Sequence, residues 1–221
     1  MRNWGIVVTV FYALTVLGLV WPGALFLAGE DVLGGLRANY TNWFQWILIG
    51  TLVSGQALLL FLSVDTSRKR LRPRAHILVS CLTAAMLVGL LAFAAILSLA
   101  VGVFGDKILD ALPIDTPAKA LGWWGCLWLF WGILFYLYFR GSPGVVTRAI
   151  SWLLKGSVLE LLVAVPCHIV VRHRHDCSAP IVTSFGIATG IAIMLLSFGP
   201  SVLLLYKKRL DAYSTRGPAT E

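Results

Sequence analysis

Six apolar stretches make up most of this chain, and each is close to the roughly 20 residues that an α-helix needs to cross a bilayer. Five are clear and one is imperfect. An unpaired backbone amide or carbonyl group is costly in lipid, so such stretches are expected to form α-helices. We therefore predict an all-α, polytopic integral membrane bundle with six transmembrane helices, at about residues 6–27, 43–64, 77–104, 122–139, 156–171 and 181–206.

The composition leaves little room for a soluble domain. Of the 221 residues, 58% are hydrophobic and 13% are charged, whereas soluble domains carry about 25% charged residues. We predict a single transmembrane domain over residues 1–210 and a short polar C-terminal tail over 211–221. Residues 30–42 are predicted to form a loop, and residues 145–154 a short interfacial helix that leads into the fifth span.

The positive charges lie mainly in the short connections between the apolar stretches, which is the pattern that sets orientation in a membrane. With the N-terminus inside, 13 of the 18 Lys and Arg residues fall on inner segments and 5 on outer ones, namely Arg37, Lys107, Lys119, Arg172 and Arg174. This bias predicts that both termini are cytoplasmic. It also indicates a lipid bilayer, not nucleic acid, as the partner of the basic residues, and we expect the bacterial cytoplasmic (inner) membrane.

Small and aromatic residues predict how the helices pack. Gly186 and Gly190 form a small-xxx-small pair that permits a close approach of another helix. Trp128 and Trp131 lie deeper than the tryptophans of the interfacial belts, and we expect them to pack against neighbouring helices or lipid. Three prolines, Pro22, Pro166 and Pro200, mark points where the helices are expected to bend.

Glu160 is the only carboxylate well inside an apolar stretch. An ionisable residue in a membrane helix usually faces the bundle interior and often has a function. On a regular helix Glu160 and Cys167 share one stripe that would face the bundle interior, and a proton or ion pathway is one interpretation. The alternative interpretation is structural: Glu160 lies near enough to the inner interface to pair with Lys155, Arg148 or Arg140, and the sequence alone slightly favours it.

Cysteines and histidines gather toward the outer end of the fifth span. The candidates for a metal or thiol site are Cys126, Cys167, His168, His173, His175 and Cys177. Imidazole and thiolate ligands suit Cu or Zn, although the charges of Arg172 and Arg174 repel a cation. A second interpretation is that Cys167 and Cys177 form a disulfide. In a third, structural interpretation, His168 is a hydrogen-bonded helix residue and the segment from Arg172 to Asp176 is a solvated turn.

Nucleotide-binding and hydrolase motifs are missing from the sequence. There is no GxGxxG and no Walker pattern, and Val53-Ser54-Gly55 lacks the preceding glycine of an intramembrane serine protease. An enzyme is therefore not the favoured class, and three hypotheses remain. The first is a non-catalytic subunit or accessory of a larger membrane assembly, with protein partners or self-association. The second is a small-solute or ion transporter that uses Glu160, and the third is an outer-face metal-binding or thiol redox protein.

Overall fold

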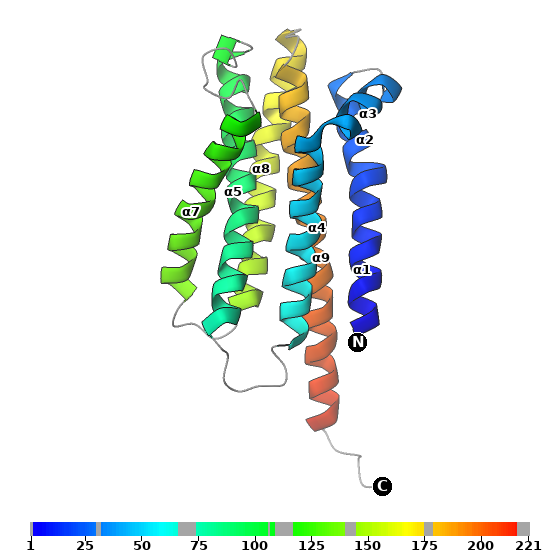
Figure 1. Cartoon of the computed structure of the whole chain (residues 1–221), viewed down its shortest axis with the longest axis vertical. Coiled ribbons are helices and arrows are strands. Elements are labelled where there is room, and N and C mark those ends of the chain that lie inside the picture. The colour runs from blue at the N-terminus through cyan, green and yellow to red at the C-terminus, as the bar shows by residue number, and fades with distance from the viewer. Residues whose placement is uncertain are drawn as a thin grey trace.

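A computed structural model describes residues 2–29, 32–65, 74–105, 107–108, 117–139, 145–174 and 179–215. The regular structure in these ranges is entirely helical (Figure 1). Six helices are long and apolar enough to cross a membrane, namely Gly5–Ala28, Trp43–Leu62, Ile77–Phe104, Ala118–Phe139, Val145–Arg174 and Ala179–Phe198. The predicted all-α bundle with six membrane-compatible helices is confirmed.

The six spans run along one common axis. The first is a continuous rod made of α1 (Arg2–Thr15), a π-helical turn η1 (Val16–Val20) and α2 (Trp21–Ala28). The others are α4 (Trp43–Asp65), α5 (Arg74–Phe104), α7 (Pro117–Phe139), α8 (Val145–Arg174) and α9 (Ala179–Thr215). Helix α1 begins and α9 ends at the same end of the bundle (Figure 1), as an even number of crossings requires.

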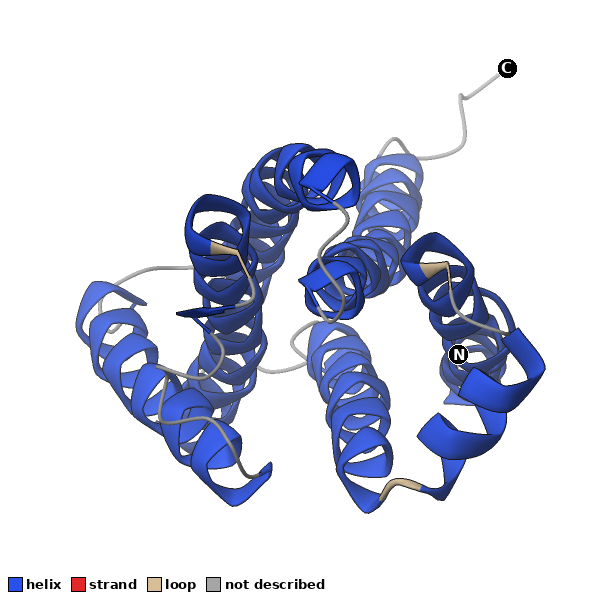
Figure 2. Ribbon diagram, turned by 90° about the horizontal axis from the view of Figure 1, so that it is seen from above, coloured by secondary structure: helices blue, strands red, loops and turns tan. Residues whose placement is uncertain are grey.

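Helices α5, α8 and α9 pack against one another and form the centre of the bundle. Figure 2 shows the first rod and α4 beside α9, and α7 on the far side of α5. Two tryptophans of α7 bind backbone carbonyls of α5: Trp124 Nε1 donates to Met86 O at 3.2 Å and Trp128 Nε1 to Leu82 O at 3.0 Å. Trp128 therefore packs against a neighbouring helix, as predicted.

The π-helical turn follows from Pro22, which has no backbone N–H to donate to the preceding turn. The N–H of Trp21 donates to Val16 O, five residues back. The carbonyl of Leu17 therefore accepts no hydrogen bond from Trp21, and Pro22 has no N–H to offer it. The hydroxyl of Tyr40 donates to Leu17 O instead. Burial raises the pKa of Tyr40, so this hydroxyl keeps its proton at physiological pH. The bend predicted at Pro22 thus takes the form of a π-helical turn with a side-chain partner from elsewhere in the chain.

Tyr40 belongs to α3 (Val32–Thr41), which occupies most of the connection that we predicted to be a loop. The loop prediction was wrong because tertiary contacts hold this short helix in place. Trp46 of α4 packs against the Tyr40 ring with centroids 6.0 Å apart, and its Nε1 donates to Tyr40 O at 2.8 Å. The side chain of Asn42, between the helices, accepts the N–H of Phe44 and caps α4.

Two other boundaries also differ from the sequence prediction. The short interfacial helix at 145–154 is not separate, because α8 runs without a break from Val145 to Arg174 and through Pro166. Gly156 costs a helix only about 1 kcal/mol, and it lets the side chain of Leu91 approach to 3.3 Å of the position that a Cβ would take. Helix α9 continues to Thr215, beyond the predicted start of the tail at residue 211.

Replacing Tyr40 with phenylalanine should lower the free energy of unfolding by about 1–3 kcal/mol, because it leaves the Leu17 carbonyl unpaired. The change is measurable by circular dichroism during denaturant titration in detergent micelles. Tyr138→Phe removes a hydroxyl from a side chain that is 62% exposed on α7 and serves as the control. Equal stability of the two variants would show that the π-helical turn does not need the hydroxyl of Tyr40.

Candidate functional site: a buried carboxylate between three helices

Glu160 lies at the middle of α8, roughly 20 Å from either end of the helix at 1.5 Å per residue. Its side chain is 2% exposed, and neither carboxylate oxygen has a hydrogen-bond partner among the described residues. Lys155, a partner suggested by the structural interpretation, is exposed on another face of α8. Arg140 lies outside the described residues. The side chain that the sequence singled out is therefore inside the bundle, and within the described residues its oxygens form no hydrogen bond.

The Glu160 side chain fills a notch in the surface of α9. A Cβ added to Gly190 would overlap Oε2 of Glu160, and one added to Gly186 would lie 3.1 Å from Oε1. Glycine at both positions is therefore what allows the carboxylate to fit between α8 and α9. The predicted small-xxx-small pair does mediate helix packing, and the group that it accommodates is the carboxylate.

Ser98 of α5 forms the third side of the notch. Its hydroxyl is fully buried, has no hydrogen-bond partner in the described part of the chain, and faces the same space at Gly186 as Oε1 of Glu160. The two carboxylate oxygens of Glu160 and the hydroxyl oxygen of Ser98, none with a hydrogen-bond partner among the described residues, thus lie close together. Buried polar atoms are normally paired, so such a group needs an explanation.

A charged carboxylate without a partner costs several kcal/mol in an apolar interior, whereas a protonated one costs much less. The notch is thus suited to the neutral acid. An ionised Glu160 would need water or a counter-charge beside it, and neither oxygen has a hydrogen-bond partner among the described residues.

Near the C-terminal end of α8, His168 binds α9. Its Nδ1 lies 2.8 Å from Thr183 Oγ1. The imidazole is buried, at 9% exposed. This is the hydrogen-bonded helix residue of the structural interpretation.

Arg172 and Arg174 bind the C-terminal ends of two neighbouring helices. Gly29 follows the last residue of α2 and Gly105 follows the last residue of α5, both with positive φ (78° and 71°). Arg172 donates to Ala28 O at 3.4 Å, and Arg174 donates to Gly102 O at 3.0 Å. Carbonyls at a helix end lack partners in their own helix and carry partial negative charge, so both arginines stabilise the helices that they cap.

The cysteines and histidines do not form one site in the described residues, where no three His, Cys, Asp or Glu side chains lie close enough to hold a metal. Cys167 packs against Gly102 of α5, whereas Cys126 is exposed on α7. His173 is in the last helical turn of α8, so the solvated turn that we predicted to begin at Arg172 was wrong there. His175 and Cys177 lie outside the described residues, and a Cu or Zn site that includes them stays a prediction.

Comparison of the chain with protein-family models, with curated proteins and with solved structures finds no match. The function is therefore argued from the site alone.

The sequence analysis did not predict that Ser98 lies beside Glu160, or that Arg172 and Arg174 cap neighbouring helices. The third span holds several small residues, and nothing in the sequence distinguishes the one that faces Glu160. The carbonyls that Arg172 and Arg174 bind belong to α2 and α5, so the sequence around the two arginines contains no signal for these contacts.

Gly190→Ala should destabilise the bundle by about 1–3 kcal/mol, because the added methyl group overlaps the carboxylate. Glu160→Ala should relieve part of this cost, with a coupling energy of about 0.5–3 kcal/mol in a double-mutant cycle. Unfolding followed by circular dichroism gives all four free energies. Gly125→Ala on α7, where a Cβ meets no atom within 4 Å, is the control. Additive effects at positions 160 and 190 would contradict the notch.

Proposed function

We propose that this chain is an integral membrane transporter in which Glu160 takes up and releases a proton, coupled to the movement of a small solute. The observation that carries the proposal is the pair of unpartnered carboxylate oxygens of Glu160, enclosed by α5, α8 and α9. A carboxylate that served only packing would be paired, or an apolar side chain would serve better at the same place.

The surroundings of Glu160 favour a movable contact. Gly186 and Gly190 present a smooth surface of α9 to the carboxylate, and Pro166 removes one backbone hydrogen bond from α8 on the outer side of Glu160. Glu160 keeps its proton while the notch is closed, and it exchanges the proton when water reaches the site. Both termini are cytoplasmic in this proposal, on the charge distribution, and the membrane is the bacterial cytoplasmic membrane.

Proton flux in liposomes tests the proposal. The purified protein is reconstituted with a pH-sensitive dye inside, and a potassium diffusion potential drives proton entry. We expect Glu160→Gln to reduce the flux to that of protein-free liposomes, since the amide has nearly the same shape and cannot carry the proton. Ser157→Ala is the matched control, because Ser157 is buried one turn away and bonds only to Leu154 O of its own helix at 2.9 Å. Undiminished flux in Glu160→Gln would overturn the proposal.

A second function, as a subunit or accessory of a larger membrane assembly, is favoured by the position of α7. This helix packs mainly on α5, and its other side exposes large apolar and aromatic side chains. They are Trp123, Leu129, Phe130, Ile133, Leu134, Tyr136, Leu137 and Tyr138. In this proposal a partner helix or a second copy covers that surface, where lipid would otherwise lie.

Native mass spectrometry of the protein extracted with its surrounding lipid tests this second function. We expect a second copy or a co-purifying membrane protein, and we expect Phe130→Ala together with Leu137→Ala to release it. Leu162→Ala with Ile169→Ala, at exposed positions of α8, should leave the complex intact. A monomer in the native extract would contradict an assembly role.

A further inference from the structure

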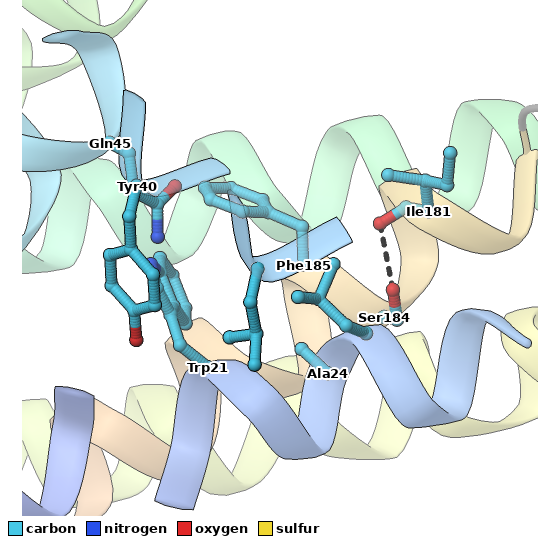
Figure 3. A pocket seen from close by; sticks show the side chains of 9 residues that line it. Trp21, Ala24, Tyr40, Gln45, Ile181, Ser184 and Phe185 are labelled. Atoms are coloured by element: carbon cyan, nitrogen blue, oxygen red, sulfur yellow. Dashed lines mark hydrogen bonds between the residues drawn. The ribbon is translucent and has the colours of Figure 1, made fainter. Parts of the chain in front are cut away.

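A half-open cavity of about 60 Å³ lies where α3 covers α2, α4 and α9. Figure 3 shows the aromatic rings of Trp21, Tyr40 and Phe185 around it, together with the polar side chains of Gln45 and Ser184. Glu160 is not among its lining residues. The cavity adjoins the π-helical turn at Val16–Val20, and such turns frequently occur at functional sites.

The indole of Trp21 offers a hydrogen-bond donor at this cavity. Trp21 is 5% exposed, its ring is held against Phe185 with centroids 5.7 Å apart, and its Nε1 has no partner among the described residues. The hydroxyls nearby already donate elsewhere: Tyr40 to Leu17 O, and Ser184 to Ile181 O at 2.9 Å. The Gln45 side chain lies next to the Trp21 ring (Figure 3), and Gln45 is 8% exposed. Nε1 itself is enclosed, so an acceptor in the cavity reaches this donor, which has no partner among the described residues, once the side chains around the indole shift.

The size and charge of the cavity limit what it can hold. An apolar cavity that binds benzene has a volume near 150 Å³, and one water needs roughly 10–15 Å³, so 60 Å³ suits about four non-hydrogen atoms. None of the lining residues is acidic or basic, so a charged ligand would lose its hydration without gaining a counter-charge.

We propose that this cavity binds one small uncharged molecule with a carbonyl or hydroxyl acceptor, such as a short amide. The acceptor bonds to Trp21 Nε1, the Gln45 amide binds the polar end, and the aromatic rings cover the rest. The class of ligand follows from the cavity alone.

Its role as the transported solute rests on the proposed function. Ser184 and Phe185 lie on one face of α9, and Gly186 and Gly190 lie on the opposite face, against Glu160. A solute in the cavity and a proton on Glu160 therefore act on the two sides of the same helix, which is the physical basis for coupling them.

Ligand-observed saturation-transfer NMR tests the site, with acetamide as the probe and acetate as a charged probe of the same size. The full chain in lipid nanodiscs should give a saturable signal with acetamide and none with acetate. Trp21→Phe should weaken acetamide binding roughly fivefold or more, because it removes the donor and keeps the ring. Trp43→Phe, at a tryptophan that is 56% exposed on α4, should leave binding unchanged.

A second variant tests the site independently, in case Trp21→Phe does not fold. Ala24→Leu fills the cavity and leaves the indole donor in place, so it should abolish the acetamide signal. A signal that does not saturate, that is equal for acetate, or that survives in both Trp21→Phe and Ala24→Leu would show that the cavity holds only water and would overturn the proposal.

Glu160→Gln separates this proposal from the transport proposal. Acetamide should still bind to this variant, since Glu160 does not line the cavity. In wild-type liposomes an inward proton gradient should drive acetamide uptake, and in Glu160→Gln it should not. If acetamide binds to the wild type but a proton gradient does not drive its uptake, the cavity is a binding site without a role in transport. Loss of binding in Trp21→Phe and Ala24→Leu with normal proton flux would leave the role of Glu160 intact.

Discussion

Polar groups inside a membrane bundle have to find partners within the protein, because lipid offers them none. Much of this structure follows from that constraint. Side chains from one helix repeatedly bind backbone carbonyls of another: Trp124 and Trp128 join α7 to α5, and Tyr12 of α1 donates to Ala192 O of α9 at 3.0 Å. These bonds fix the rotation of each helix where apolar packing between similar side chains is not selective.

The same constraint explains the irregular places. Pro22 has no backbone N–H to donate, and the helix forms a π-helical turn just before it. The hydroxyl of Tyr40 donates to Leu17 O, which has no backbone donor. At the ends of α2 and α5, where carbonyls remain unpaired, α8 contributes Arg172 and Arg174. The charges that argued against a metal site in the sequence thus have a structural role, because through them α8 binds the ends of α2 and α5.

Glu160 and Ser98 are exceptions to this rule. Their side-chain oxygens are buried at the same place and have no hydrogen-bond partner among the described residues. A single unpaired oxygen is a modest cost, but here three lie at the same glycine-lined surface. The proposal of a proton site rests on this cluster. The Trp21 cavity lies on the other side of α9 and offers its own unpaired donor, which makes α9 the element that both sites share.

The sequence by itself determined the number and approximate position of the membrane-compatible helices, because a 20-residue apolar stretch in lipid has almost no alternative to a helix. It also identified Glu160 and the Gly186–Gly190 pair, each from a pattern within one segment. Only the tertiary structure decided that these two features touch and that Ser98 joins them. It also decided that His168 binds α9, that Arg172 binds α2 and that Cys167 faces α5. Which face of one helix meets which face of another depends on the rotation and depth of both. Those are set by contacts between segments far apart in the chain, which no local pattern records.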